Sequence, residues 1–299
     1  MKIVECVPNI SEGRRPEVVQ EVVGVVRQVP GIKILDYSSD SSHNRSVITF
    51  IGEPENVKDA AYQLVKKAAE LINLDNHTGE HPRMGATDVL PFIPIQGVTM
   101  EECVALAHEV GSRIGDELGV PVYFYGEAAR QPERRNLANV RKGQYEKIKT
   151  LIATERIPDA GPNKMPVFGA TAVGARMPLI AYNINLDTKN KEIADKIAVA
   201  MRSSGGGFKY VKAMGVFLED KGIAQVSMNL ENYEKTPIFR VFEAVKREAQ
   251  RYGVNIIGSE VIGLVPQKAL FASAEFYLQI DDFSLAQVLE SSIFGGKNE

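Results

Sequence analysis

Long apolar runs are missing from this sequence. No stretch approaches the roughly 20 residues that a membrane-spanning helix needs. Residues 1–8 are too few and too charged to contain the apolar segment of a secretory signal. Cysteine is also scarce: Cys6 and Cys103 are the only two, and each falls in an apolar periodic segment, which indicates reduced core residues. These absences predict a soluble, cytoplasmic protein with no membrane partner.

The sequence also lacks an excess of positive charge. It has 35 Lys and Arg residues against 38 Asp and Glu residues, a formal net charge of −3 and a pI of about 5.9. This balance argues against a general nucleic-acid-binding protein or one that binds anionic membranes. The hydrophobic content of 44% and the charged content of 24% are typical of globular proteins. A chain of 299 residues is long enough for one large domain or two medium ones, each with its own core.

Hydrophobic periodicity predicts the same order of elements twice along the chain. In the first copy we expect strands at residues 3–7, 32–37, 46–51 and 89–95, and helices at residues 16–28 and 53–71. A helix at residues 100–118 and a strand at residues 120–125 follow this copy. In the second copy we expect strands at residues 179–186, 211–218, 223–230 and 254–261, and helices at residues 191–202 and 237–252.

This order predicts an α+β protein made of two ferredoxin-like βαββαβ halves, with helices layered on mainly antiparallel sheets and a substrate cleft between the halves. We expect residues 1–178 to form the N-terminal subdomain and residues 179–299 the C-terminal one. Between the halves, residues 156–177 are rich in Gly and Pro but contain several apolar side chains. We interpret them as a linker that packs against the protein.

The loop at residues 79–94 contains the most informative candidate for a functional site. Pro82 drives His81 away from helical backbone angles, and glycines flank the pair. Histidine takes and returns a proton near neutral pH, and Arg83 and Asp88 are close in sequence. We therefore predict that His81 is a general base. The simpler alternative is a loop histidine that hydrogen-bonds a neighbouring carbonyl group.

Residues 77–81 also match the H-x-x-E-H pattern of one class of metalloprotease. That chemistry needs both histidines on one face of a continuous helix. Gly79 in the middle and Pro82 immediately afterwards make such a helix unfavourable. We therefore expect no metal at this site.

Three further segments supply candidate ligands. Asp36 lies near the end of a predicted strand, where its carboxylate can point into a cleft, and Asn44 and Arg45 begin the next strand. Arg83 can hold a carboxylate through its planar guanidinium, although it could instead form a surface ion pair with Glu80. Residues 130–142 hold five basic side chains against one acidic one. They form either a solvated face or the cationic wall of a site for anionic substrates.

The chain resembles a known family in several of these segments. Residues 4–13, 79–94, 122–128, 169–176, 183–186 and 258–266 are similar to the formiminotransferase domain of glutamate formiminotransferases. The resemblance covers nearly the whole chain. Bifunctional family members continue into a cyclodeaminase domain where this chain stops, so we expect the transferase without the cyclodeaminase domain.

The resemblance implies an activity, a fold and site residues. The family transfers a formimino group from N-formimino-L-glutamate to N5 of tetrahydrofolate in histidine degradation, giving 5-formiminotetrahydrofolate and L-glutamate. It is a homodimer in which two α/β halves flank a substrate cleft. The family's catalytic histidine corresponds to His81. Its folate-binding stretch corresponds to Gly161, Pro162, Asn163, Lys164, Met165, Pro166, Val167, Phe168 and Gly169.

The folate-binding stretch departs from the family pattern at Phe168, where a tryptophan is expected, and it is one residue shorter. A phenylalanine can still stack on a ring of the folate. The resemblance and the residues together predict that His81 accepts a proton and then returns it, without a metal. Either Asp36 or Asp88 would orient its imidazole.

The remaining roles concern substrate binding. Arg45 and Arg83 would hold substrate carboxylates, and the basic residues at 130–142 would guide a polyglutamate tail. Two other functions stay open at this stage. One is formyl transfer between N-formylglutamate and tetrahydrofolate on the same scaffold, and the other is a folate-binding module without catalysis.

Overall fold

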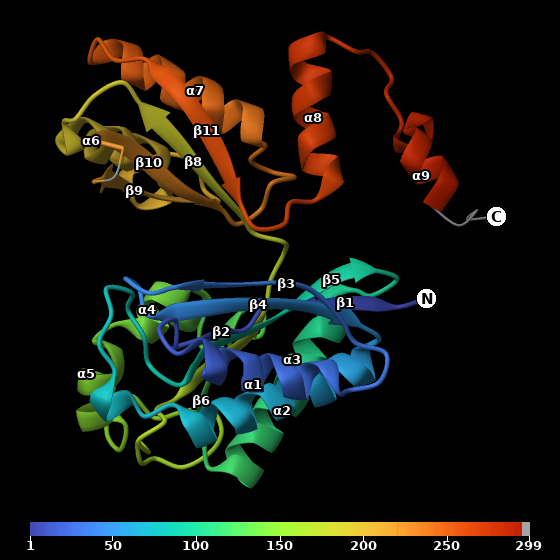
Figure 1. Ribbon diagram of the computed structural model, residues 1–299, viewed down its shortest axis with the longest axis vertical. Coiled ribbons are helices and arrows are strands. Elements are labelled where there is room, and N and C mark those ends of the chain that lie inside the picture. The colour runs from blue at the N-terminus through green and yellow to red at the C-terminus, as the bar shows by residue number, and fades with distance from the viewer. Residues whose placement is uncertain (220, 295–299) are drawn as a thin grey trace. The chain divides into compact units, whose positions relative to one another are not determined.

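The computed structural model describes residues 1–219 and 221–294 and divides the chain into two compact units. The N-terminal unit is Met1–Arg176 and the C-terminal unit is Met177–Glu299. Each unit has its own cluster of buried apolar side chains and its own sheet (Figure 1). This is the mixed α+β architecture of two helix-covered sheets that the sequence predicts.

The N-terminal unit is built on a seven-stranded sheet. Its strands are β1 (Ile3–Cys6), β2 (Asn9–Ile10), β3 (Lys33–Asp40), β4 (Arg45–Gly52), β5 (Thr87–Gln96), β6 (Val122–Gly126) and β7 (Thr171–Ala175). Its helices are α1 (Pro16–Arg27), α2 (Pro54–Leu71), α3 (Met100–Leu118), α4 (Leu137–Arg141) and α5 (Gln144–Leu151). Short 3-10 helices occur at Leu74–Asn76 and Pro132–Arg135.

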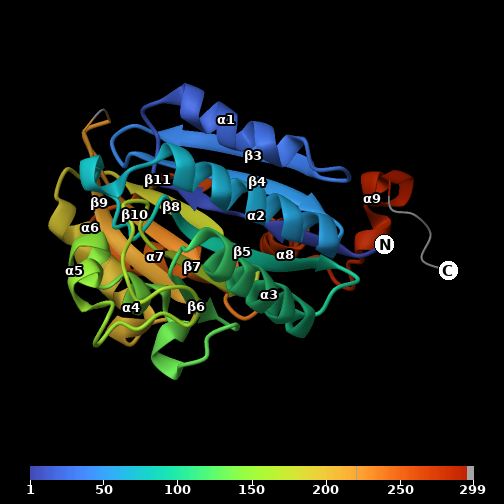
Figure 2. The same ribbon diagram turned by 90° about the horizontal axis from the view of Figure 1, so that it is seen from below.

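Helices α1, α2 and α3 lie side by side on one face of this sheet (Figure 2). Both α1 and α2 begin with a proline in the first turn, where the missing N–H is not needed, and α3 begins with a capping box between Thr99 and Glu102. Their apolar stripes pack on alternate residues of the strands, such as Ile48 and Phe50 of β4. Arg45 starts the same strand on the other set of alternating positions, so it points away from the helices.

The strand order supports the ferredoxin-like core of this unit. β4 lies between β1 and β3, and β1 pairs with β5, all antiparallel. β1 and β2 are two pieces of one strand, because both pair with β4 and β5 on either side of Pro8, which has no N–H to donate.

One sequence prediction is wrong here. Residues 171–175, which we interpreted as part of a linker, form β7, which pairs in parallel with both β5 and β6. Every residue of β7 is buried. A strand that is buried on both faces has no alternation of polar and apolar residues, so periodicity does not reveal it. The short helices α4 and α5 were also not predicted.

The C-terminal unit has a four-stranded, antiparallel sheet in the order β11-β8-β10-β9. Its strands are β8 (Ile180–Leu186), β9 (Val211–Leu218), β10 (Ile223–Leu230) and β11 (Ile256–Ile262). Its helices are α6 (Lys191–Met201), α7 (Ile238–Arg251), α8 (Gln267–Leu278) and α9 (Leu289–Phe294), with 3-10 turns at Ser203–Gly205 and Leu285–Gln287. Helices α6 and α7 pack on one face of the sheet, and α8 packs on α7 (Figure 1).

Two glycines allow the loop before β5 to run against the segment before β7. Gly85 and Gly169 form an antiparallel bridge. Next to it, the Ala170 N–H donates to the Met84 carbonyl at 2.9 Å and the Ala86 N–H donates to the Phe168 carbonyl at 2.7 Å. A Cβ atom at Gly85 would lie 2.0 Å from the Ala170 carbonyl oxygen, so no larger residue fits without moving backbone.

We expect Gly85→Ala to destabilise the protein by about 1–3 kcal/mol, because the added methyl group has no space and its neighbours are backbone atoms. Gly24→Ala is a matched control, since Gly24 lies inside α1 with nothing within 4 Å of the added atom. It should stabilise the protein by about 0.5–1 kcal/mol through helix propensity. Urea unfolding of both variants tests this, and equal stabilities would contradict the close approach.

Candidate active site

The candidate site is organised around Asp88, whose side chain is about 1% exposed in β5. Arg45, the first residue of β4, places Nη1 3.0 Å from Asp88 Oδ2. Arg141, the last residue of α4, places Nη2 2.5 Å from the same oxygen. The other carboxylate oxygen accepts a hydrogen bond from the Met84 N–H at 3.0 Å. One buried carboxylate therefore holds two arginines from separate elements.

His81 lies beside this group. Its Nδ1 is 2.7 Å from Arg45 Nη1 and 2.7 Å from the carbonyl oxygen of Pro82. Both contacts use the same ring nitrogen, so the tautomer determines which of them is a hydrogen bond. Within residues 1–219 and 221–294, no protein group hydrogen-bonds Nε2 of His81. The ring therefore has one anchored nitrogen and one that is available to a substrate.

The electrostatics of the site keep His81 neutral. Burial, followed by the positive charges of Arg45 and Arg141, lowers the pKa of His81 from its ordinary 6.5 to about 4. Burial would raise the pKa of Asp88, but Arg141 and Arg45 outweigh it, so the pKa is lowered and the carboxylate is ionised. Burial lowers the pKa of Arg45 to about 10, which leaves it charged at neutral pH. Two cations and one anion give this group a net positive charge.

The neighbouring polar residues hold Arg45 and its loop in place. Asn9 accepts a hydrogen bond from Arg45 Nε at 2.9 Å. Asn44 has a left-handed backbone with φ of 49°. Its side chain accepts from the Gly13 N–H at 2.9 Å and donates to the Thr78 carbonyl at 2.9 Å. The amide of Asn44, a predicted ligand, is thus engaged in joining two loops to β4.

Arg83 does not join the group around Asp88. Its Nη1 and Nη2 contact the two carboxylate oxygens of Glu146 in α5 at 2.9 and 2.7 Å, and its Nε donates to His77 Nδ1 at 3.2 Å. The alternative that we considered, an ion pair with Glu80, is wrong because Glu146 occupies the guanidinium. Arg45 therefore contacts His81, whereas Arg83 fixes the loop of His81 to α5.

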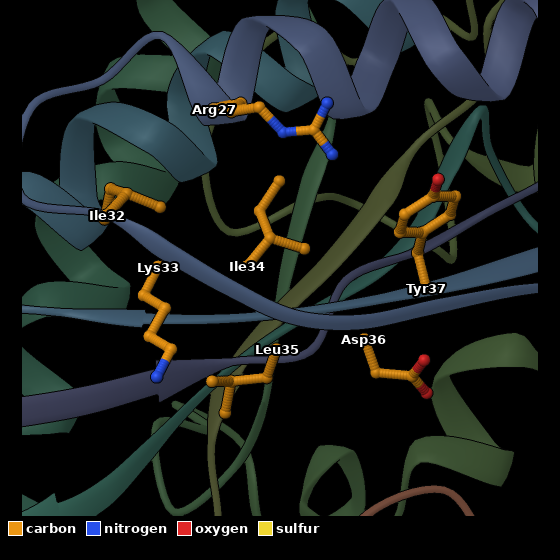
Figure 3. A pocket seen from close by; sticks show the side chains of 7 residues that line it. All are labelled: Arg27, Ile32, Lys33, Ile34, Leu35, Asp36 and Tyr37. Atoms are coloured by element: carbon orange, nitrogen blue, oxygen red, sulfur yellow. The ribbon is translucent and has the colours of Figure 1, made fainter.

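Asp36 also lies apart from His81. It sits on β3 opposite Thr49, four residues along β4 from Arg45, which is about 13 Å at the rise of a strand. Figure 3 shows its carboxylate on the opposite side of β3 from Ile34 and Tyr37, at a pocket of about 450 Å³. Of the two carboxylates considered for orienting His81, Asp88 is the nearer, and it reaches the ring through Arg45.

The end of the stretch 161–169 runs next to the loop that carries His81. Besides the bridge between Gly85 and Gly169, the carbonyl of Val167 accepts from the Leu74 N–H at 2.7 Å. Phe168 packs partly buried on the N-terminal core. The other predicted members lie in the same connection: Gly161, Pro162 and Pro166 are half-buried, Met165 is buried, and Asn163 and Lys164 are exposed. The structure thus brings the end of the predicted folate-binding stretch, Val167 to Gly169, next to the loop that carries His81.

Residues 77–81 do not form the helix that the metalloprotease pattern requires, because the chain is irregular from His77 to Arg83. His77 instead uses Nε2 on the Asn44 carbonyl at 3.0 Å. Across residues 1–219 and 221–294, no three His, Cys, Asp or Glu side chains gather closely enough to bind a metal ion. The helices in that part of the chain are also too short or too polar to cross a bilayer.

Sequence reasoning missed three residues of this region. Arg141 was included only as a member of the basic run at 130–142, since nothing local shows that it reaches Asp88. The only sequence feature that indicates Asn9 is its place in a segment similar to the formiminotransferase family. No sequence feature indicates Glu146, the partner of Arg83, because α5 was not predicted.

Comparison with known proteins identifies the family. The model of the N-terminal subdomain of the formiminotransferase domain matches residues 3–176, and the model of the formiminotransferase domain matches residues 181–292. The chain belongs to the formiminotransferase family. It is 55% identical to the glutamate formimidoyltransferase of Streptococcus pyogenes serotype M1, over 98% of this chain and 99% of that protein. Formiminotransferase relatives therefore match along both units.

More distant members of the family show the same match. The glutamate formimidoyltransferase of Thermoplasma acidophilum is 50% identical over 97% of both chains. The formimidoyltransferase-cyclodeaminase of Gallus gallus is 48% identical over 93% of this chain, which aligns with 53% of that longer protein.

We expect Asp88→Asn to destabilise the protein by about 3–5 kcal/mol, because it leaves Arg45 and Arg141 close together without their shared anion. Asp59→Asn is the control: Asp59 pairs with Arg113 at the surface, with 60% of its side chain exposed, and its loss should leave the unfolding midpoint almost unchanged. Urea unfolding at neutral pH measures both. Similar midpoints for the two variants would show that Asp88 does not hold the arginines.

Proposed function

We propose that this protein transfers the formimino group of N-formimino-L-glutamate to N5 of tetrahydrofolate, giving 5-formiminotetrahydrofolate and L-glutamate. The observation that carries the proposal is a neutral histidine with a free Nε2 beside a net positive arginine pair. It occurs in a chain that is 55% identical to a protein named glutamate formimidoyltransferase. Tetrahydrofolate is a co-substrate of this reaction, and the chemistry proposed for His81 needs no metal.

His81 is the general base and then the general acid. In the tautomer whose Nδ1–H donates to the Pro82 carbonyl, Nε2 takes the proton that N5 loses as N5 bonds to the formimino carbon, and returns it to the glutamate nitrogen as the bond from that carbon breaks. The two transfers balance, so the histidine ends neutral. The lowered pKa of His81 keeps its lone pair available at neutral pH, and the protonated ring becomes a strong acid for the second step.

Arg45 and Arg141 supply positive charge for an anionic substrate. Asp88 compensates one of the two charges, and the other remains for a carboxylate of N-formimino-L-glutamate. Arg141 also has a buried Nε without a hydrogen-bond partner in the described residues. A buried donor left unpaired costs stability, and a bound carboxylate would satisfy it. Because Arg83 is paired with Glu146, we assign it to fixing the loop of His81 and not to binding the substrate.

The folate lies along residues 161–169 in this proposal. The support is the family match and the position of this stretch beside the loop of His81. The exposed Lys164 is suited to an anionic polyglutamate tail, and the half-buried ring of Phe168 to an aromatic ring of the folate. We further propose that the protein is a cytoplasmic homodimer that acts in histidine degradation, with residues 1–178 and 179–299 as its two subdomains.

We expect His81→Ala to reduce kcat by about 10²- to 10⁴-fold, because it removes the acid-base group. His108→Gln is the control, since His108 lies in α3 and hydrogen-bonds the Ala128 carbonyl outside the site. Single-turnover assays with N-formimino-L-glutamate and tetrahydrofolate measure the effect. Full turnover of a folded His81→Ala variant would exclude the assignment.

The same assay separates the rival functions. A wild-type protein that prefers N-formyl-L-glutamate as donor is a formyltransferase. One that binds tetrahydrofolate tightly but transfers neither group is a binding module.

The pH dependence of kcat/KM tests the state of His81. The base must be unprotonated, so activity should fall only as the pH drops towards about 4. Arg45→Gln removes a positive charge from His81 Nδ1, so its pKa should rise and the acid limb should move to higher pH. Protonation of the substrates affects the wild-type protein and the Arg45→Gln variant equally. The difference between their two pH profiles therefore reports the titration of His81. Identical acid limbs would contradict the proposed coupling.

A further inference from the structure

His77 is the second histidine of the loop that carries His81, and only 9% of it is exposed. Its Nε2 lies 3.0 Å from the carbonyl oxygen of Asn44, and its Nδ1 lies 3.2 Å from Nε of Arg83. A carbonyl oxygen can only accept a hydrogen bond, and a guanidinium N–H can only donate one. Nε2 of His77 therefore carries the proton and Nδ1 the lone pair, so the two partners select a single neutral tautomer.

The surroundings keep His77 neutral. Burial is the largest cause that lowers its pKa, and the charges of Arg83 and Arg14 act in the same direction. The hydrogen bond to the Asn44 carbonyl and the charge of Glu12 oppose them without reversing the shift. Because both ring nitrogens are engaged with protein groups, His77 offers no lone pair to a substrate. Its effect on the site must come from what it fixes in place.

The carbonyl group that His77 binds belongs to the peptide that joins Asn44 to Arg45. Asn44 has a left-handed backbone with φ of 49°, an uncommon conformation for a residue with a side chain. Its amide is tied to Gly13 and Thr78 by hydrogen bonds of 2.9 Å. Those bonds fix the residue before β4, whereas the bond from His77 fixes the plane of the peptide from which β4 starts.

The loop therefore contacts two consecutive residues of the chain. His77 binds the carbonyl of Asn44, and four residues later Nδ1 of His81 lies 2.7 Å from Nη1 of Arg45. A rotation of the peptide before Arg45 would move the origin of its side chain and hence change the distance from its guanidinium to His81. Since a Coulomb interaction weakens with distance, the orientation of this peptide determines how strongly Arg45 acts on the imidazole.

We propose that His77 is a positioning residue: it fixes the peptide before Arg45 and so holds the Arg45 guanidinium beside the ring of His81. The inference rests on the proposed function for its catalytic meaning, because the proton transfers are assigned to His81 there. The contacts that fix Arg45 stand independently of that reaction. Arg83 has a separate part, since it links the other side of the His77 ring to Glu146.

The charged groups that face His81 give the direction of the expected effect. Burial is the largest cause that lowers the pKa of His81, followed by the charge of Arg45 on β4. Arg141 on α4 acts in the same direction, and Asp88 on β5 acts against them. His43, in the turn before β4, has its ring centroid 6.3 Å from that of His81. If Arg45 moves away, its positive charge acts less strongly on the ring, so the pKa of His81 should rise.

Two substitutions separate the hydrogen bonds of His77. The amide nitrogen introduced by His77→Gln takes the place of Nε2, which keeps the bond to the Asn44 carbonyl. The amide oxygen introduced by His77→Asn takes the place of Nδ1, which keeps the bond from Arg83 and removes the one to Asn44. The chain has four histidines, so NMR titration of the full chain can follow the ring of His81, assigned by its loss in His81→Ala.

We expect the titration midpoint of His81 to move to higher pH by about one pH unit in His77→Asn and to stay near the wild-type value in His77→Gln. The acid limb of kcat/KM should move with it. In the Arg45→Gln background, His77→Asn should cause no further shift, because its effect passes through Arg45. His108→Asn is the matched control: it removes a bond of 2.8 Å from histidine Nε2 to the Ala128 carbonyl, outside the site, and should leave the midpoint unchanged.

An unchanged midpoint in His77→Asn would overturn the inference, as would an equal shift in His77→Gln or a further shift in the Arg45→Gln background. If His77→Asn does not fold, the ring nitrogen NMR signals of the wild-type protein decide: an Nε2–H tautomer of His77 supports the bond to Asn44, and an Nδ1–H tautomer excludes it. The titration needs no turnover. A wild-type protein without transferase activity would therefore overturn the proposed function, while the midpoints would still decide the positioning.

Discussion

The buried carboxylate of Asp88 is the constraint on which the rest of the N-terminal site depends. An ionised group with about 1% exposure needs compensating charge, and two arginines from β4 and α4 provide it. Their approach fixes Arg45 next to His81, and this positive neighbour helps to keep the imidazole neutral. Asp88 therefore positions Arg45, and Arg45 in turn helps to keep His81 neutral. A triad in which a carboxylate touches the histidine directly would raise the pKa of the imidazole instead, and so would give a weaker acid for the second proton transfer.

The loop of His81 can reach this group only because the backbone comes unusually close to its neighbours. Gly85 and Gly169 meet with no room for a side chain, and Gly79 similarly approaches the carbonyl of His43, where a Cβ would lie 2.4 Å away. Arg83 adds a second restraint by joining the loop to Glu146 of α5. The irregular loop is thus held at both ends by contacts that are independent of ligands. This rigidity suits an acid-base group whose position must be set before the substrates bind.

The sequence predicts the fold where periodicity is visible and fails where burial hides it. The predicted bounds of the strands in the C-terminal sheet lie close to the observed ones, and β8 alternates strictly between buried and half-buried residues. β7 was missed because both of its faces are buried. In the site, His81 could be singled out because Pro82 and the glycines mark its loop locally. The contacts of Asp88 with Arg141 and of Arg83 with Glu146 are long-range, and no local pattern encodes them. Asp36 was a plausible orienter by strand position alone, but the register of β3 puts it about 13 Å along the sheet from Arg45.

The two sheets differ in the polarity of their helix-free faces. In the N-terminal unit, Arg45 points away from the helices, and its group has one positive charge to spare. In the C-terminal unit the corresponding face has the carboxylate of Glu260, which accepts hydrogen bonds from the amides of Asn183 and Gln225. Two units of the same fold class thus present unlike polar groups, because function depends on which residues occupy the outward positions of the strands.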